Sequence, residues 1–179
     1  MAGIDESRKF IPVRIAVLTV SDTRTLGDDK SGDTLSEMIA AAGHALADRA
    51  LVKDDIAAIR KTVERWIADP QIDCVITTGG TGFTGRDVTP EAIRPLFEKE
   101  IEGFAILFHT QSFEKVGTST IQSRASAGVT HGTYIFCLPG SPGACRDAWD
   151  GILKFQLDAR HGPCNFVEIM PRLEEHRRK

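Results

Sequence analysis

The chain has 179 residues, of which 41% are hydrophobic and 26% charged, and its formal net charge is −3. These are ordinary globular values, and at about 150 residues per domain the length predicts one domain with one sizeable core. The sequence has no block of like charge. This argues against a nucleic-acid partner, because nucleic-acid surfaces need clustered Lys and Arg to displace counterions.

No targeting or membrane segment is recognisable in the sequence. The N-terminal stretch MAGIDESRKF is polar, and no apolar run approaches the ~18 residues needed to span a bilayer. The histidines show no zinc-ligand spacing, and no CxxC pair occurs among the four cysteines, Cys74, Cys137, Cys145 and Cys164. We therefore expect a soluble, cytoplasmic protein with reduced thiols and no membrane partner.

The first part of the chain predicts a strand and a helix behind a leader. Residues 1–12 should be disordered or loosely attached, whereas residues 13–20, VRIAVLTV, form an apolar run typical of a strand buried on both faces. A polar loop, SDTRTLGDDKSGD, follows. Ser31 is predicted to cap the next helix, whose apolar residues have helical spacing and which ends at Gly43.

Strands and helices alternate through the rest of the chain. Buried strands are clear at residues 74–78, CVITT, and 133–138, TYIFCL, whereas residues 118–128 have no clear pattern and residues 171–179 should form a charged tail. The other predicted elements are a weaker strand at 44–52, a helix capped by Asp54 or Asp55 and ending before Pro70, helices near 90–97 and 103–113, and a helix at 142–157. The alternation predicts a single α/β domain at residues 13–170, with a mostly parallel central sheet and helices on both faces.

Three polar or glycine-rich loops leave the carboxyl ends of these strands, where ligands of such sheets bind. The most informative loop is TTGGTG at residues 77–82. Its glycines let backbone N–H groups come close to an anion, because no Cβ obstructs the approach. The pattern predicts a phosphate-binding loop, although the same glycines could form an ordinary tight turn.

The glycine loop matches neither common phosphate motif. No G-x-G-x-x-G follows the first strand. The spacing from Gly80 to Gly85 is that of a P-loop, but Arg86 and Asp87 stand where Lys and Ser or Thr belong. This mismatch disfavours a small P-loop-like kinase and favours a different phosphate site, in which Asp87 holds Mg²⁺.

Asp54 is a second acid at a strand end, after the predicted strand at residues 44–52. Two carboxylates that converge from neighbouring loops would suit a magnesium–nucleotide site, because Mg²⁺ usually takes one or two carboxylates plus phosphate oxygens and water. Both acids have structural alternatives. Asp87 could form a turn before a helix capped by Thr89 and begun by Pro90, and Asp54 could cap the helix that follows it.

The third loop, LPGSPG, places Ser141 and Pro142 as the cap and first residue of a helix. The free N–H groups at the N-terminus of that helix could also bind a phosphate. No feature indicates covalent catalysis, because a G-x-S-x-G elbow is absent and no cysteine lies in the polar strand-end loops.

Together these loops resemble the molybdopterin-binding family, which includes the MogA proteins and the gephyrin G domain. The resemblance covers roughly residues 13–170 and is carried by TTGGTG…RDVTPEA, the LPGSP turn, VSDT after the first strand and the Ser31–Gly32 pair. Three further segments resemble the MoaB branch of that family, at residues 102–104, 117–124 and 157–166. The resemblance implies a molybdopterin-binding domain that assembles as a homotrimer or a homohexamer. The apolar segment at residues 104–113 could supply the interface or belong to the core.

The resemblance also implies an activity. Active members are molybdopterin adenylyltransferases, in which the pterin's terminal phosphate attacks the α-phosphate of ATP and pyrophosphate leaves. Asp54 and Asp87 would bind Mg²⁺ and activate the transfer, and the anion site would be lined by Gly79, Gly80, Thr81 and Gly82. Other positions near the ligand are matched by Ser21, Asp22, Ser112, Pro139, Gly140 and Ser141. The alternative is a non-catalytic pterin-binding or assembly protein of the same fold.

Overall fold

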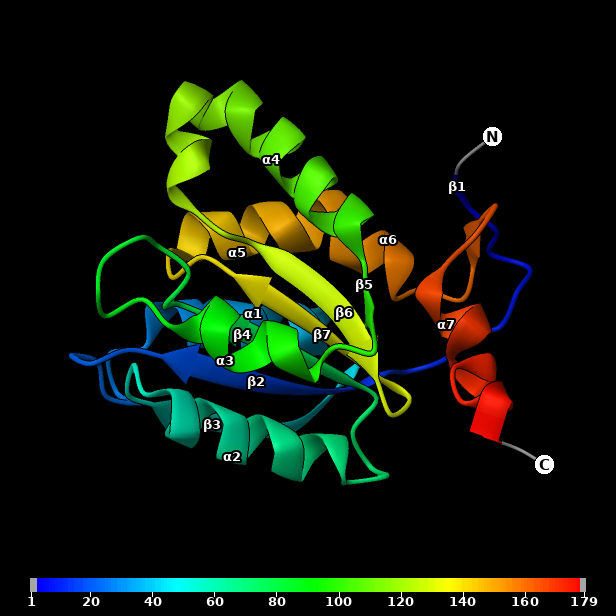
Figure 1. The fold of residues 1–179 in the computed structure, drawn as a ribbon. Helices are drawn as coiled ribbons and strands as arrows, with labels where there is room; N and C mark the ends of the chain where they lie inside the picture. Colours follow the sequence, from blue (N-terminus) through cyan, green and yellow to red (C-terminus); the bar gives the residue numbers. More distant parts are fainter. Residues whose placement is uncertain (1–2, 178–179) are drawn as a thin grey trace.

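A six-stranded β-sheet forms the centre of the molecule, which we describe from a computed structural model of residues 3–177 (Figure 1). Four parallel strands lie in the spatial order β3-β2-β4-β7, with the bounds Ala45–Val52, Arg14–Val20, Cys74–Thr78 and Thr133–Leu138. Strand β6 (Ser126–Thr130), antiparallel to β7, and strand β5 (Lys99–Glu100), antiparallel to β6, complete the edge beyond β7. The predicted α/β class with a mostly parallel sheet is confirmed.

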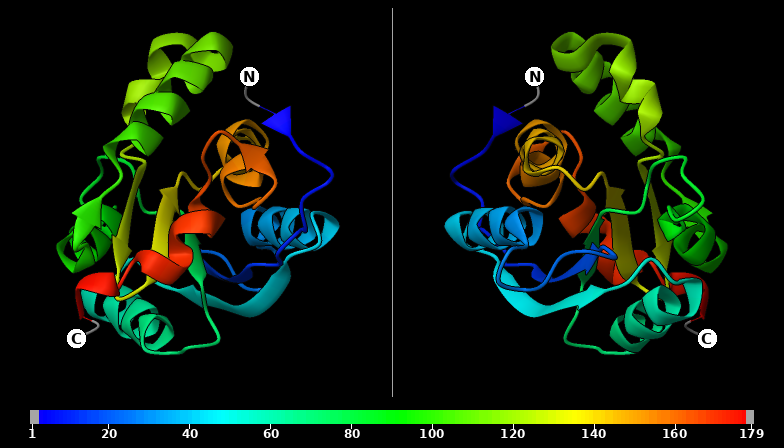
Figure 2. Two further views of the ribbon diagram at one scale, coloured as in Figure 1. Left: turned by 90° about the vertical axis from the view of Figure 1, so that its right-hand side faces the viewer. Right: turned by 90° about the vertical axis from the view of Figure 1, so that its left-hand side faces the viewer.

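Helices cover both faces of this sheet (Figure 2). One face carries α1 (Lys30–Ala41), α4 (Glu102–Val116) and a continuous helix made of α5 (Pro142–Ala148), the π-helical turn η3 (Trp149–Leu153) and α6 (Lys154–Gln156). The other face carries α2 (Ile56–Ile67) and α3 (Thr89–Ile93), which continues into the 3-10 turn η1 (Arg94–Leu96). Both helix layers were expected from the alternation of elements.

The central strands are apolar throughout because helices cover them on both sides. In β2, Ile15 and Val17 belong to the core under α1, α4 and α5, whereas Ala16 and Leu18 belong to the core under α2 and α3. This division follows from the strand geometry, since successive side chains point to opposite faces. The sheet is therefore buried on both faces, and its strand ends hold the connecting loops in place.

The antiparallel edge of the sheet was not predicted. Strand β6, SAGVT, consists mostly of small residues, which do not favour a strand over a loop. Its geometry depends on tertiary packing, because a Cβ on Gly128 would lie 2.3 Å from Cγ of Phe97. The 3-10 turn η2 (Gly117–Gln122) joins α4 to this strand.

The first helix begins differently from the prediction. Asp29, and not Ser31, is its N-cap, because the Asp29 side chain accepts a hydrogen bond from the Gly32 N–H at 3.0 Å. Asp29 is completely buried and also accepts from Thr19 Oγ1 at 2.6 Å and Arg49 Nη2 at 2.9 Å. Burial alone would raise the pKa of Asp29, but these hydrogen bonds outweigh it and lower the pKa. A buried ion pair therefore decides where the helix starts.

Both ends of the described chain are tied to the domain, which differs from the disordered or loosely attached leader that we expected. Strand β1 (Gly3–Ile4) pairs with β8 (His161–Gly162), and Arg8 forms an ion pair with Glu168. Helix α7 (Phe166–Ile169) is followed by the 3-10 turns η4 (Met170–Arg172) and η5 (Glu175–Arg177). Leu173 packs against the main core, which polar composition alone does not reveal. Residues 1–2 and 178–179 of the two predicted segments lie outside the described residues.

The cysteines of the chain are all free thiols. Cys74, Cys137 and Cys145 are buried and Cys164 is exposed. Burial raises the pKa of the Cys137 and Cys145 thiols to about 11, so both are protonated at neutral pH. Within residues 3–177, no helix combines the length and the apolar character that crossing a membrane requires.

His44 makes the stability of this fold depend on pH. The His44 ring is buried, and its Nδ1 accepts a hydrogen bond from the Val13 N–H at 3.1 Å. Burial lowers the pKa of His44, against a smaller raising effect of Asp158. The unfolded chain therefore binds more protons near pH 6 than the folded chain does. The contribution of His44 to the free energy of unfolding is complete above the ordinary His pKa of about 6.5 and is lost as the pH falls below it.

We expect the His44→Asn variant to lose less stability on acidification than the wild type, because Asn keeps an acceptor but does not titrate. Urea unfolding at about pH 7.5 and about pH 5.5 measures this difference. Carboxylates titrate in both proteins, so their contribution to the loss of stability cancels when the two proteins are compared. An equal loss in the two proteins would show that His44 is not the titrating group.

Candidate functional site

A cavity of about 380 Å³ lies beyond the carboxyl ends of the parallel strands. Its wall is formed by the loops after β2, β3, β4 and β7, which the strand order places side by side. Of the predicted site residues, it is lined by Ser21, Asp22, Asp54, Gly79, Gly80, Thr81, Asp87 and Gly140. The structure therefore brings together residues from four separate loops.

The glycine loop after β4 is held against the end of β2. Gly79 and Gly80 have φ angles of +99° and +64°, which favour glycine. A Cβ on Gly79 would lie 2.2 Å from the carbonyl oxygen of Val20, and one on Gly80 would lie 2.8 Å from Oδ1 of Asp54. Glycine is therefore required here by both conformation and space. A phosphate-binding loop and a tight structural turn would both need glycine at these positions.

Thr89 fastens the far end of the same loop. Its Oγ1 donates to the Gly79 carbonyl at 2.8 Å, and its N–H donates to the Gly80 carbonyl at 3.0 Å. The expected role of Thr89 as a helix cap is wrong, since the N-cap of α3 is Val88 and no side chain caps that helix. The loop from Gly79 to Thr89 is thus closed at its base.

Asp87 lies inside this closed loop. Its Oδ2 accepts hydrogen bonds from the Thr84 N–H at 2.8 Å and Thr84 Oγ1 at 2.6 Å. Burial acts to raise the pKa of Asp87, but Thr84, the Gly82 amide and Arg124 outweigh it and lower the pKa. Gly82 lies outside the cavity lining, but a Cβ on it would be 2.9 Å from Oδ2 of Asp87. Asp87 is therefore an ionised carboxylate packed against the glycine loop.

Asp54 is available to the cavity because its neighbour caps the helix. Asp55 is the N-cap of α2, and its Oδ1 accepts from the Ala58 N–H at 2.8 Å. The pKa of Asp54 is raised, first by burial and then by the negative charges of Asp22 and Asp87. Three acids thus surround one cavity, and their mutual repulsion acts mainly on Asp54.

Arg86 offsets part of that negative charge. Its guanidinium donates to Oδ2 of Asp22 from Nε at 2.8 Å and to Oδ1 from Nη2 at 2.9 Å, and Nη2 also reaches the Asp54 carbonyl at 3.2 Å. Sequence reasoning noted Arg86 only as a mismatch to the P-loop motif. Its position next to Asp87 on a strand-end loop was the available signal for this role.

The acids fit a magnesium ion only if a ligand completes the coordination. No group of three or more His, Cys, Asp or Glu side chains in the described part of the chain is arranged to hold a metal by itself. Asp54 and Asp87 nevertheless repel each other, and the charge of Asp87 adds to burial and to the charge of Asp22 in raising the pKa of Asp54. A divalent cation between them would relieve this repulsion, and Mg²⁺ commonly takes two carboxylates plus phosphate oxygens and water.

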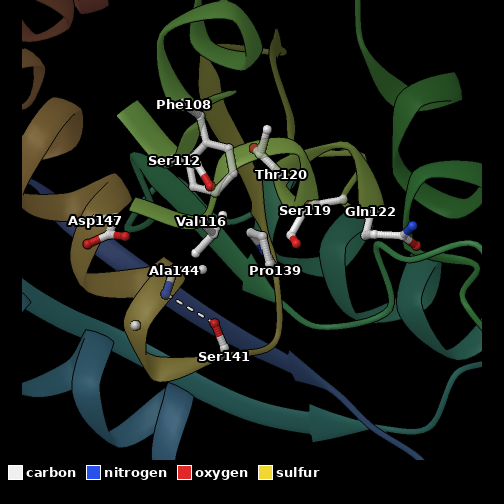
Figure 3. Close-up of a pocket in the computed structure, with 12 residues that line it drawn as sticks. Phe108, Ser112, Val116, Ser119, Thr120, Gln122, Pro139, Ser141, Ala144 and Asp147 are labelled. Atoms are coloured by element: carbon white, nitrogen blue, oxygen red, sulfur yellow. Dashed lines mark hydrogen bonds between the residues drawn. The ribbon is translucent and has the colours of Figure 1, made fainter. Parts of the chain in front are cut away.

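A second cavity, of about 400 Å³, contains three further predicted residues, Ser112, Pro139 and Ser141 (Figure 3). Ser141 caps α5 as predicted, because its Oγ accepts from the Ala144 N–H at 3.1 Å. The same residue pair, Pro139 and Ser141, flanks Gly140, which lines the first cavity. The two cavities therefore share the turn at residues 139–141.

Sequence reasoning missed the remaining walls of the second cavity. Phe108 comes from α4, Thr120 from η2 and Asp147 from α5, and all three side chains are directed toward the cavity in Figure 3. These residues lie inside helices or in the unassigned segment at residues 118–128, so no loop pattern marked them. Arg24, by contrast, lies in a recognised loop and donates to the Gly140 carbonyl at 3.2 Å.

Comparison with known proteins gives consistent matches. Residues 16–159 match a family model described as "Probable molybdopterin binding domain". Molybdenum cofactor biosynthesis protein B of Escherichia coli (strain K12) is 53% identical over 160 residues, covering 89% of this chain and 94% of that protein. A crystal structure of Molybdenum cofactor biosynthesis protein B matches with a TM-score of 0.84 at 37% identity, covering 94% of this chain and 99% of that one. The crystal structure of the tungsten cofactor synthesizing protein MoaB from Pyrococcus furiosus matches with a TM-score of 0.72 at 32% identity, covering 94% of this chain and 98% of that one.

Replacing Gly79 by Ala should destabilise the fold by ~2 kcal/mol or more. The positive φ alone costs a non-glycine residue roughly 1–2 kcal/mol, and the new methyl group would clash with the Val20 carbonyl. Gly85→Ala in the same loop is the matched control, because its Cβ would meet no atom within 4 Å. Thermal and urea unfolding measure both variants. Similar stabilities for the two would contradict the close approach at Gly79.

Proposed function

Since the chain belongs to the molybdopterin-binding family, in its MoaB branch, and thus to molybdenum cofactor biosynthesis, we propose that it binds molybdopterin and adenylylates it with Mg-ATP. In this reaction a phosphate oxygen of the pterin forms a bond to the α-phosphorus of ATP, and the bond to the leaving pyrophosphate breaks. The observation that carries the proposal is the convergence of Asp54 and Asp87 on one cavity beside Gly79 and Gly80.

The glycine loop supplies the anion-binding part of this site. Gly79 uses its N–H for the Leu138 carbonyl at 3.0 Å, and the following residues, Gly80 and Thr81, form the cavity wall. Their amides could donate to phosphate oxygens at close range, because Gly80 has no side chain. Arg86 and Arg24 bring positive charge to the same group of loops.

Asp54 and Asp87 would hold Mg²⁺, which when bound neutralises charge on the phosphates and polarises the phosphorus under attack. The protein's own contribution is to hold two anions in line, and such positioning supplies most of the catalysis in phosphoryl-type transfers. Asp87 is suited to this because it stays ionised, as its lowered pKa indicates. Asp54, whose pKa is raised, gains most from the cation.

The second cavity would hold the pterin. It offers hydroxyl groups from Ser112, Thr120 and Ser141, the Asp147 carboxylate and the apolar ring of Phe108, a mixture that suits a flat polar heterocycle (Figure 3). The shared turn at residues 139–141 connects this cavity to the acids. A pterin bound here could therefore direct its phosphate into the first cavity.

We also propose that the protein assembles as a homo-oligomer, a trimer or a hexamer, through α4. This helix projects from the body of the molecule in Figures 1 and 2. It exposes large apolar side chains, including Ile106 at 64% and Phe113 at 57%. Phe104 and Phe108 of the same helix are buried, so the segment at residues 104–113 contributes to the core as well. An apolar outer face of this kind is typical of a contact surface.

Asp54→Asn and Asp87→Asn should each lower pyrophosphate release from ATP and molybdopterin by on the order of 10²–10³-fold, because losing a metal carboxylate costs several kcal/mol of barrier. Asp55→Asn is the matched control, since Asn also caps helices well and Asp55 does not line the cavity. Wild-type turnover in either site variant would contradict the proposed roles.

Nucleotide titration with and without Mg²⁺ separates the enzyme from a non-catalytic pterin-binding protein. An adenylyltransferase should bind ATP more tightly with Mg²⁺ than without it. Pterin binding combined with no ATP binding at millimolar concentrations would leave only the binding or assembly role.

Leu107→Glu combined with Phe113→Glu should reduce the molar mass in sedimentation equilibrium to that of a single chain, because two charges would be buried in the proposed interface. Both side chains are exposed on α4, so folding should persist. Ile169→Glu, an exposed apolar position on α7, is the control and should leave the mass unchanged. A monomeric wild type, or an unchanged mass in the double variant, would contradict an interface on α4.

A further inference from the structure

Arg124 connects the segment before β6 to the loop that carries Asp87. Its backbone N–H donates to the Thr81 carbonyl at 2.9 Å. Its side chain donates from Nε to the Gly82 carbonyl at 3.0 Å and from Nη2 to the Asp87 carbonyl at 3.0 Å. One residue from a distant part of the chain therefore holds both the beginning and the end of the loop at residues 81–87.

The guanidinium is itself held in a fixed orientation. Nη1 donates to Oε1 of Glu91 on α3, and the guanidinium carbon lies 5.3 Å from the ring centroid of Phe83. The Arg124 side chain is only 24% exposed. A planar fork with donors in three directions matches this set of acceptors, whereas the single ammonium of a lysine would not.

These contacts determine where the amides of the loop point. Arg124 binds the Thr81 carbonyl, and in a planar trans peptide the N–H of the next residue points the opposite way. That next residue is Gly82, which packs directly against the Asp87 carboxylate: a Cβ on Gly82 would lie 2.9 Å from Oδ2. Holding the Thr81 carbonyl therefore turns the Gly82 amide toward Asp87.

We propose that Arg124 is a positioning residue that fixes the Asp87 carboxylate and the glycine-loop amides in the geometry that receives a metal–phosphate ligand. Arg124 does not line the cavity and holds the loop through backbone carbonyls and the Phe83 ring, so it acts through Asp87 and not on the ligand. The part of this proposal that concerns Mg²⁺ rests on the proposed function. The ordering of the loop does not.

Arg60 provides a matched control for a purely structural arginine. It donates from Nε to the Ala92 carbonyl and from Nη2 to the Glu91 carbonyl, both at 3.0 Å. Arg60 thus holds backbone carbonyls of the neighbouring helix α3 in the same chemical way, but it lies on α2 and its hydrogen bonds go to α3 and not to the loop at residues 81–87. Its loss should affect stability without affecting Asp87.

The first test measures amide hydrogen exchange in the metal-free protein. In Arg124→Met, the Thr84 and Asp87 amides should exchange about tenfold faster or more, because the loop loses two charged hydrogen bonds. The Ala92 amide in α3 should change little, and Arg124→Lys should give an intermediate result. Unchanged exchange at Thr84 and Asp87, or an equal effect in Arg60→Met, would overturn the proposal. If Arg124→Met does not fold, Arg124→Lys serves the same comparison.

The second test measures Mn²⁺ binding by electron paramagnetic resonance in the presence of ATP, together with the Mg²⁺ dependence of pyrophosphate release. Outer residues that orient a ligand carboxylate typically contribute 10–100-fold to metal affinity, and we expect a loss of about that size in Arg124→Met but not in Arg60→Met. Equal metal affinity in wild type and Arg124→Met would overturn the metal-positioning role. Faster loop exchange in Arg124→Met, found together with a wild type that releases no pyrophosphate, would instead refute the proposed function and leave the positioning of Asp87 intact.

Discussion

The contact between Gly79 and the end of β2 is the constraint on which the site depends. The backbone of the glycine loop passes so close to the Val20 carbonyl that no side chain fits at residue 79. Parallel pairing of β4 with β2 and of β2 with β3 then places the loop after β3 next to the glycine loop. Asp54 and Asp87 are far apart in sequence, and it is this packing of neighbouring strand ends that brings them to one cavity.

The charges at this cavity are only partly balanced within the protein. Asp22 has a full partner in Arg86, and Asp87 has donors in its own loop. Asp54 is left with a raised pKa, because burial and two neighbouring acids act on it together. An arrangement that served stability alone would pair this carboxylate. Leaving it unpaired costs stability, and the magnesium ion that we propose for this cavity would offset that cost.

The sequence predicted the parallel core and the loops of the site, because both depend on local patterns. Apolar runs such as residues 74–78 identify buried strands, and glycines at strand ends identify close approaches. The elements it missed depend on tertiary contacts. Strand β6 is specified by the fit of Phe97 over Gly128, and Arg124 gains its role only when the segment before β6 folds against the loop. No residue spacing in the sequence predicts either contact.

Helix capping also depends on tertiary contacts that the sequence does not reveal, here at the level of single residues. Asp and Ser are similarly good N-caps, so propensity could not choose Asp29 over the predicted Ser31, or Asp55 over Asp54. The structure assigns the cap to Asp29 because Arg49 and Thr19 already hold its carboxylate at that place. It assigns the second cap to Asp55, and Asp54 is thereby left to face the cavity. Having two adjacent acids lets one stabilise the helix while the other faces the cavity, so the helix cap and the ligand role that we propose for Asp54 do not compete for one side chain.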